Sequence, residues 1–309
     1  MLARVAEHLY WLSRYIERAE ATARLAIAAS DTILDLPDGG PYDWESLMQV
    51  FGSGDSDPGI SEVEVMEQLV LSLDHSGSIR ASIASARENA RVTRDLIPKD
   101  AWIALNELHG LIERQSFAGF DRSSRIRLLK QVISSCRLWH GCLVASQARD
   151  LSWLFLRLGD RLEHADMVSR LVDPRVTQMV PGASTRWSSY EAIGWQNLLT
   201  ALGGVELYRH SARNRMHGSD VLDFVLRDTN FPQSMAAALH SFRRYLNKLP
   251  HQRVSTDLLD GTIDGLTKLD LERLTPDLLT QNMDWIQQGL VTLHGHISAE
   301  YFFFQSNSP

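Results

Sequence analysis

Acidic and basic side chains recur at helical spacing near the start of the sequence. Arg14, Glu17 and Arg24 fall on one stripe, with Glu20 beside it, because steps of three, four and seven residues return to the same face of a helix. A glutamate among arginines can act as a general base in an open cleft or join a buried ion-pair network. Solvated ion pairs would each contribute only about 0.3 to 0.5 kcal/mol to stability. The recurrence of Glu17 as Glu163 later in the chain therefore favours a buried or functional network over exposed ion pairs.

A second helical segment carries three arginines on one face, Arg87, Arg91 and Arg94. Like charges one turn apart repel by roughly a few tenths of a kcal/mol, so something anionic should face them. One hypothesis is an anionic or carboxylate ligand held by bidentate arginines. The other is a structural network in which the repeated helices supply the carboxylates, from Glu17, Glu20, Glu163 and Asp166.

The candidate ligand- or partner-binding network combines the polar residues of these segments with a tryptophan and an asparagine of the next helix. Its members are Arg14, Glu17, Arg18, Glu20, Arg87, Glu88, Asn89, Arg91, Arg94, Trp102, Asn106, Glu163, Asp166 and Arg243. Glu17 and Glu163 are the candidates for a catalytic role, and Trp102 is expected in the core. The second copy retains Arg243, but Asn247 and Pro250 stand at the places of the other two arginines, so any site is lopsided.

The helical segment that carries Glu17 is repeated later in the sequence. Its apolar residues alternate in steps of three and four, which makes one stripe of a core-facing helix. These residues are Leu2, Val5, Leu9, Leu12, Ile16, Ala19, Ala23 and Ala26. The segment from Leu151 repeats the stripe at an offset of 146 residues, the separation of Glu17 and Glu163.

Further blocks recur in the same order at slowly growing offsets. Trp44 recurs as Trp195 at an offset of 151 residues, and Ser78 as Ser234 at an offset of 156. A weaker echo relates His140-Gly141 to His294-Gly295. A period of this size corresponds to one domain, so the pattern indicates a tandem duplication.

The sequence thus predicts an all-α protein of two tandem-duplicated helical-bundle halves packed with pseudo-twofold symmetry. The first repeat spans residues 1–146 and the second spans residues 147–309, packed together as one compact unit. Gly, Pro, Asp and Ser punctuate the helices at three predicted loops, residues 37–41, 52–59 and 173–182.

Composition and charge narrow the classes of partner. The 309 residues are 44% hydrophobic and carry a formal net charge of -7, which fits a globular chain without a global positive field. We expect neither nucleic acid nor membrane as a partner, since no run approaches the roughly 20 apolar residues of a membrane span.

Cys136 and Cys142 point to different faces of one helix and fit a reducing compartment. The N-terminus lacks the apolar stretch of a signal peptide, so the chain is predicted to be cytoplasmic.

Familiar metal and nucleotide motifs are missing from the sequence. It contains neither the paired Glu-x-x-His motifs of a di-iron bundle nor His-Glu-x-x-His. It also lacks the Gly-rich loops that cradle phosphates, and neither cysteine sits in a nucleophile motif. We therefore expect no metal and no cofactor.

Several stretches resemble signature segments of the alpha-E superfamily, a helical family named for its Glu-Arg motif. They are Tyr10 to Glu20 around Glu17-Arg18, Ala86 to Arg91, Leu158 to Asp166 as a second Glu-Arg motif, and Leu226 to Ser234. The resemblance spans nearly the whole chain. It has three departures: His164 replaces the arginine of the second motif, Asp160 falls where an arginine is usual, and Gln233 stands where the family tends to have Arg.

The resemblance implies a role beside ATP-dependent enzymes. Alpha-E proteins tend to be encoded beside, or fused to, circularly permuted ATP-grasp proteins and transglutaminase-like proteins. The leading hypothesis is a non-catalytic helical partner or substrate-binding subunit of an ATP-grasp amidoligase that makes amide bonds or peptide tags. The alternative is an enzyme whose Glu/Arg cleft performs acyl or amide chemistry on a carboxylate or peptide substrate. A third reading is a purely structural homo-oligomer.

Overall fold

The secondary structure is helical throughout the part of the chain that can be described. A computed structural model describes residues 1–35, 44, 48, 60–116, 121–173, 188–211, 216–250 and 253–302, and over these residues no strand occurs. The predicted all-α class is thereby confirmed for them. The predicted loops at 37–41, 52–59 and beyond residue 173 lie outside the described residues.

The helices are named by their order in the chain. They are α1 (Ala3–Asp35), α3 (Glu62–Leu71), α4 (Ile79–Val92), the 3-10 turn η1 (Arg94–Leu96), α5 (Lys99–Glu113), α6 (Arg122–Ser146), α7 (Leu151–Val172), α9 (Ser188–Leu202), α10 (Val205–His210), α11 (Gly218–Arg227), α12 (Met235–Leu246), α13 (Arg253–Lys268) and α14 (Pro276–Tyr301). Among the described helices, none is long and apolar enough to cross a membrane.

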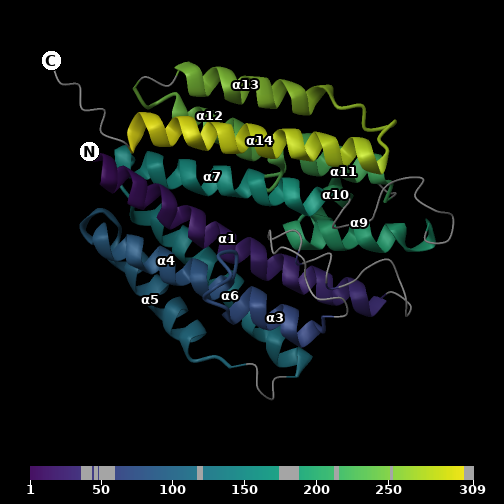
Figure 1. Ribbon diagram of the computed structural model, residues 1–309, viewed down its shortest axis with the longest axis horizontal. Coiled ribbons are helices and arrows are strands. Elements are labelled where there is room, and N and C mark those ends of the chain that lie inside the picture. The colour runs from purple at the N-terminus through teal and green to yellow at the C-terminus, as the bar shows by residue number, and fades with distance from the viewer. Residues whose placement is uncertain are drawn as a thin grey trace.

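Two long helices, α1 and α7, lie side by side at the centre of the molecule and run in the same direction (Figure 1). They approach most closely where small residues meet the partner's backbone. A Cβ atom on Gly159 would lie 2.0 Å from the carbonyl oxygen of Tyr10, and the hydroxyl of Ser13 donates a hydrogen bond to the carbonyl of Leu156 at 2.5 Å. Position 159 therefore requires glycine, because the close backbone of α1 leaves no room for a Cβ atom.

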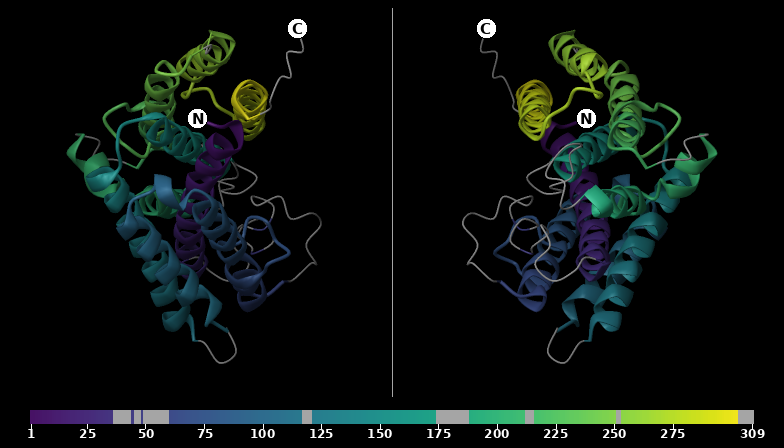
Figure 2. Two further views of the ribbon diagram at one scale, coloured as in Figure 1. Left: turned by 90° about the vertical axis from the view of Figure 1, so that its left-hand side faces the viewer. Right: turned by 90° about the vertical axis from the view of Figure 1, so that its right-hand side faces the viewer.

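The other helices form two groups around this central pair. In the first half, α1 packs on α4 and α6, α4 on α5, and α5 on α6. In the second half, α7 packs on α12 and α14, α12 on α13, and α13 on α14. Figure 2 shows the groups on opposite sides of the central pair. Buried apolar side chains of both halves belong to one continuous core cluster.

The helices α4 and α12 begin with the same cap. The hydroxyl of Ser78 accepts from the amide of Ala81 at 3.0 Å, and the hydroxyl of Ser234 accepts from the amide of Ala237 at 3.0 Å. Each serine also donates to the carbonyl six residues earlier, that of Ser72 or of Asp228. Such caps satisfy amides at the first turn that have no partner within the helix.

The close approach of α1 and α7 generates the first prediction. We expect Gly159→Ala to lower the free energy of unfolding by about 3 kcal/mol, because the methyl group would meet the backbone of Tyr10. The matched control is Gly141→Ala in α6, where a Cβ meets nothing within 4 Å and higher helix propensity should give a small gain. Urea denaturation of both variants tests this. An unchanged midpoint for Gly159→Ala would contradict the packing.

Candidate functional site

A buried glutamate on α7 joins the two central helices. The Glu163 carboxylate accepts from Arg14 Nε at 2.7 Å and from Arg18 Nε at 2.6 Å, both on α1. Only 1% of the Glu163 side chain is exposed. Burial by itself would raise the pKa of Glu163, but the charges and hydrogen bonds of Arg14 and Arg18 lower the pKa to about 2. Glu163 is therefore ionised and occupied on both oxygens, which fits a structural brace.

Aromatic rings cover this first cluster. The Arg14 guanidinium lies 4.6 Å from the centre of the Trp11 ring, and Arg18 lies 5.5 Å from that of Tyr15, distances at which a cation is attracted to the ring face. His294 of α14 stacks on Tyr10, whose hydroxyl lies 3.1 Å from His294 Nδ1. His294 is thus a packing residue, and burial together with the charge of Arg14 lowers its pKa to about 4.

A second cluster surrounds the equivalent glutamate of α1, Glu17. Its carboxylate lies 2.7 Å from His164 Nδ1 on α7, and His164 Nε2 lies 3.0 Å from the carbonyl oxygen of Gln233. A carbonyl can only accept, so Nε2 carries a hydrogen, and a further proton must lie between Nδ1 and Glu17. Burial would raise the pKa of Glu17, but the hydrogen bond and charge of His164 lower it overall. Glu17 is therefore a carboxylate that accepts a hydrogen bond from His164.

Asp160 extends the second cluster along α7. Its carboxylate is 1% exposed and pairs with Arg157 at 2.7 Å and with Arg161 at 2.9 Å. Burial would raise the pKa of Asp160, but these two arginines depress it far below its usual range. His140 of α6 approaches from the other side, with Nε2 at 3.9 Å from Asp160 and 3.7 Å from Glu17.

The two clusters occupy equivalent positions of α1 and α7 but differ in charge. At the offset of 146 residues, the place of Trp11 is taken by Arg157 and that of Tyr15 by Arg161. Arg14, which lies over the Trp11 ring in the first cluster, corresponds to Asp160 in the second. Asp160 lies between two arginines, Arg157 and Arg161. This asymmetry is distinct from the predicted lopsidedness, which concerned Arg243, Asn247 and Pro250 and stays a prediction.

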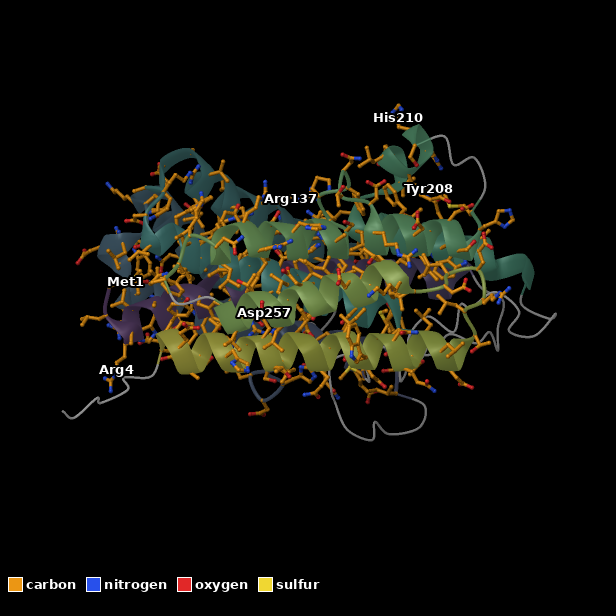
Figure 3. The ribbon with its side chains drawn as sticks, turned by 90° about the horizontal axis from the view of Figure 1, so that it is seen from above. Met1, Arg4, Arg137, Tyr208, His210 and Asp257 are labelled. Atoms are coloured by element: carbon orange, nitrogen blue, oxygen red, sulfur yellow. The ribbon has the colours of Figure 1, made fainter. Side chains whose placement is uncertain are left out.

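The second cluster borders an open pocket of about 450 Å³. Its walls come from α1, α6, α7, the junction of α9 and α10, and residues 231–233. The charged and imidazole side chains that line it are Glu17, Glu20, Arg24, Arg137, His140, Arg157 and Arg161. Figure 3 shows Arg137 on the same long side of the molecule as Tyr208 of α10, away from α14. Four arginines against two glutamates give this pocket a positive excess.

Three side chains beside the pocket could offer ligand atoms to a metal ion. One atom each of Glu17, His140 and Asp160 lies within 4.8 Å of the others. However, both Asp160 oxygens accept hydrogen bonds from Arg161, and the second oxygen of Glu17 faces His164. Because these cations already neutralise the carboxylates, a divalent ion would be repelled, so the geometry favours an anion.

Arg87 and Arg91 of α4 and Arg94 of η1 do not face the repeated helices, so the predicted pairing with the carboxylates of those helices is wrong. Arg87 donates to Asn106 Oδ1 at 2.8 Å, and Arg94 lies over the Trp102 ring at 5.4 Å. Arg91 pairs with the neighbouring Glu88 at 2.7 Å on the surface. The physical reason is that α4 presents these side chains toward α5 and solvent, which offer an amide, a ring and a local carboxylate instead.

The remaining predicted residues make contacts within their own halves. Asn89 Oδ1 lies 2.7 Å from His8 Nδ1. Three ion pairs complete the set: Glu20 with Arg24 at 2.5 Å, Asp166 with Arg170 at 2.9 Å, and Arg243 with Asp260 at 3.0 Å. Of the predicted network, the structure thus brings Arg14, Glu17, Arg18, Glu20 and Glu163 to the central helices and the pocket, and it places the α4 residues elsewhere. A ligand or partner role for any of them stays a prediction.

Five charged or imidazole side chains of the pocket were not among the predicted site residues: Arg24, Arg137, His140, Arg157 and Arg161. The echo between His140 and His294 was a usable signal for one of them. Arg157 and Arg161 could have been found from the charge that replaces Trp11 and Tyr15 in the second copy. Arg137 carries no repeat signal, and only the packing of α6 against α1 reveals it.

Comparison with known proteins settles the family. A family model described as a predicted alpha-helical domain with a conserved ER motif, Alpha-E, matches residues 1–302. The chain belongs to the Alpha-E family. In this Alpha-E protein the Glu-Arg pair Glu17-Arg18 supplies one residue to each buried cluster.

Curated relatives of this Alpha-E chain are much longer proteins. Uncharacterized proteins of Mycobacterium bovis and Mycobacterium tuberculosis are 22% identical to it over 269 residues, which is 80% of this chain and 30% of each relative. The chain thus spans about 30% of the length of the curated relatives it matches. No solved structure shows a significant match.

The buried brace generates the second prediction. We expect Glu163→Ala to lower the free energy of unfolding by about 3 to 5 kcal/mol, because Arg14 and Arg18 would lose the carboxylate that neutralises them. Thermal and urea denaturation measure the change. The control is Glu88→Ala, which removes an exposed surface partner and should leave stability nearly unchanged. Equal effects of the two substitutions would contradict the structural role of Glu163.

The same brace predicts a pH dependence. Glu163 protonates near its usual pKa of 4.5 in the unfolded chain but near 2 in the folded chain. Its contribution to stability is therefore complete above about pH 4.5 and is lost as the pH falls from there toward 2. Glu163→Gln should flatten this part of the stability curve, measured by urea denaturation at a series of acidic pH values. A variant that keeps the wild-type acid slope would contradict the assignment.

Proposed function

We propose that the chain is a substrate-binding helical partner in an ATP-dependent amide-bond-forming system, and that the pocket beside Glu17 holds a carboxylate of the substrate. The observation that carries the proposal is the pocket of about 450 Å³ in which four arginines face two glutamates. An arginine fork matches a carboxylate with two parallel hydrogen bonds.

Two arginines of the pocket have donors to offer. Arg157 Nε is buried and has no hydrogen-bond acceptor within the described part of the chain. The Arg137 side chain is 60% exposed, and its contact with Glu20 is long, at 3.5 Å. Arg157 also pairs with Asp160 through Nη1, at 2.7 Å, so only its Nε is without an acceptor there. Arg24 is held by Glu20, and Arg161 is held by Asp160 through two donors. An incoming carboxylate would therefore bind between Arg137 and Arg157, with Arg24 and Arg161 as fixed walls.

Binding is better supported than catalysis by the carboxylates themselves. A general base works best with a pKa near the working pH, whereas pairing with cations lowers the pKa of Glu17 and of Glu163. The enzyme hypothesis for these two residues is correspondingly weaker. A partner that activates a carboxylate with ATP would supply the chemistry, and this chain would hold the substrate for it.

The partner follows from the family resemblance. Alpha-E proteins are associated with circularly permuted ATP-grasp proteins and transglutaminase-like proteins, and an ATP-grasp amidoligase acts on carboxylates. The greater length of the mycobacterial relatives supports the idea that an Alpha-E unit works together with other domains. We propose that the chain is cytoplasmic, because its proposed partner uses ATP. The two free cysteines of the chain fit a reducing compartment.

We also infer that the chain arose by duplication of one helical unit and keeps an approximate twofold axis. Equivalent helix pairs in the two halves support this, as do the matched caps of Ser78 and Ser234. Reciprocal contacts between the central helices also support it: Arg14 of α1 bonds Glu163 of α7, and His164 of α7 contacts Glu17 of α1.

The third prediction tests the pocket directly. Isothermal titration calorimetry would compare short peptides that end in a free carboxylate with the same peptides ending in an amide. We expect the free carboxylate to bind and Arg137→Ala to weaken its affinity about tenfold, because a charge-assisted hydrogen bond contributes about 1.5 to 3 kcal/mol. Arg91→Ala, an exposed arginine of α4, is the matched control and should bind normally. Equal affinity for the acid and the amide would contradict the proposal.

The partner is tested by affinity purification of the tagged chain from its native host. We expect an ATP-grasp protein to elute with it, and ATP hydrolysis in the eluate. Elution of the chain alone would remove the partner from the proposal while leaving the pocket measurement to decide on the ligand.

A further inference from the structure

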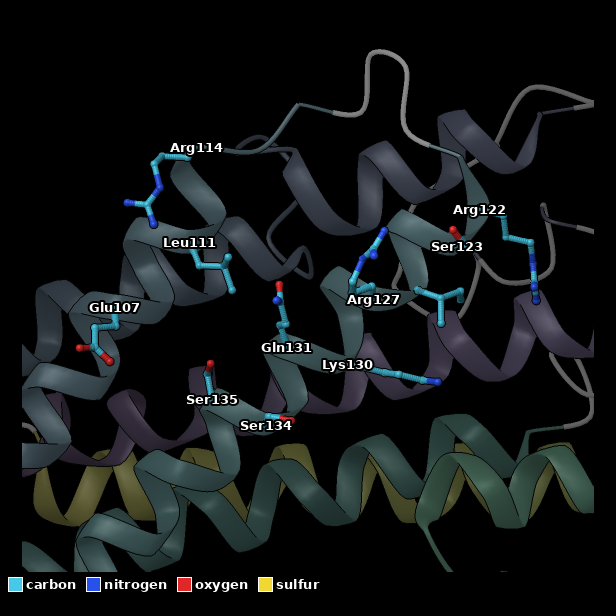
Figure 4. Close-up of a pocket in the computed structure, with 11 residues that line it drawn as sticks. Glu107, Leu111, Arg114, Arg122, Ser123, Arg127, Lys130, Gln131, Ser134 and Ser135 are labelled. Atoms are coloured by element: carbon cyan, nitrogen blue, oxygen red, sulfur yellow. The ribbon is translucent and has the colours of Figure 1, made fainter.

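A second hollow lies between α5 and α6 in the first half and shares no lining residue with the first pocket. It has a volume of about 910 Å³ and is open along its length. Figure 4 shows Arg114 at the end of α5 and Arg127, Lys130 and Gln131 on α6, with the side chains of Leu111 and Gln131 pointing into the space between the helices. We call this hollow the α5/α6 groove.

The α5/α6 groove gathers cations that the fold does not use. Arg114, Arg127 and Lys130 are exposed, and within the described ranges none of them has a carboxylate within 4.0 Å. Arg127 donates to the hydroxyl of Ser124 at 2.9 Å, and its charge adds to the hydrogen bonds of Ser124 and Ser123 that lower the pKa of Asp121. Glu107 is the single acidic residue that lines the groove.

Some surface arginines of the first half are paired with carboxylates, as Arg80 is with Glu113 at 2.8 Å and Arg91 with Glu88 at 2.7 Å. The whole chain has more acidic than basic residues, 38 against 31. Arg114, Arg127 and Lys130 give the lining of this groove an excess of positive charge within an acidic chain, and a negatively charged partner would be attracted to it.

We propose that the α5/α6 groove is the docking site for an acidic peptide segment of a partner protein. Carboxylates of the segment would pair with Arg114, Arg127 and Lys130. Ser134 and Gln131 lie in the wall and offer hydrogen bonds to its backbone, and Leu111 and Ile126 offer apolar contacts. The site is separate from the carboxylate pocket and stands or falls without it.

The length of the groove sets the length of the segment. The stretch of α6 from Arg122 to Ser135 rises roughly 20 Å at 1.5 Å per residue, which an extended peptide of about six residues would match at 3.3 Å per residue. A short segment also suits the charge of the chain. Long polyanions such as nucleic acid would meet the net charge of -7 of the whole molecule, whereas a peptide meets mainly the local cations, since salt screens beyond about 8 Å.

Fluorescence anisotropy tests the proposal with the full chain. The probe is a labelled eight-residue peptide in which aspartates alternate with glycines, and the comparison peptide carries asparagines instead. We expect about tenfold tighter binding of the acidic peptide, and a loss of about tenfold in the double variant Arg127→Glu/Lys130→Glu. Raising the salt concentration should weaken binding, because the attraction is between exposed charges.

A control with the same change of charge separates the groove from the general field. Lys268→Glu/Arg273→Glu alters two exposed cations in the second half and should bind the acidic peptide within about twofold of the wild type. Lys130→Gln, a single neutral change, checks that the double variant has not simply unfolded. The proposal is overturned by equal binding of both peptides, by equal loss in the control, or by tighter binding of a single-stranded RNA of the same charge.

Discussion

A carboxylate inside a protein must face cations, and this requirement ties α1 to α7. Glu163 has 1% of its side chain exposed and takes both of its hydrogen-bond donors from the other helix. Glu17 in return faces His164 across the same interface. Removing one partner of such a pair leaves an uncompensated buried charge, so register and spacing of the two helices are fixed together. The contact at Gly159 brings their backbones close enough for these side chains to meet, and every other helix packs onto one member of the pair or onto a neighbour that does.

The two clusters share a plan but differ in what they can do. The first is closed by rings, with Trp11, Tyr15 and His294 covering Arg14 and Arg18. In the second, arginines replace the rings, Asp160 replaces an arginine, and the cluster borders an open pocket. The same buried interface thus holds the fold together on one side and provides charged walls for a ligand on the other. The carboxylate-binding role is accordingly assigned to the second cluster and not to the first.

The helices and the two central glutamates could be predicted from the sequence, because apolar periodicity and repetition are local signals, but the partners of these glutamates were predicted wrongly. The stripe from Leu2 to Ala26 gave the first helix, and the recurrence of Glu17 as Glu163 identified the two glutamates that now lie buried. The partners of Arg87 and Arg91 could not be predicted in the same way. Tertiary packing decides which face of α4 meets α1. Arg87 therefore bonds Asn106 and Arg91 bonds Glu88, instead of the carboxylates of α1 and α7. The pocket likewise needed α6, whose Arg137 and His140 are brought to Glu17 only by the tertiary fold.

The most direct test of this account is a double-mutant cycle on Arg14 and Glu163. Stabilities of the wild type, Arg14→Met, Glu163→Met and the double variant, measured by urea denaturation, give the coupling energy of the two side chains. If their contact across α1 and α7 is the constraint on which the fold depends, the double variant will be more stable than the sum of the single losses predicts, by at least about 1.5 kcal/mol. Additive losses, within about 0.5 kcal/mol, would show that the contact does not hold the two halves together.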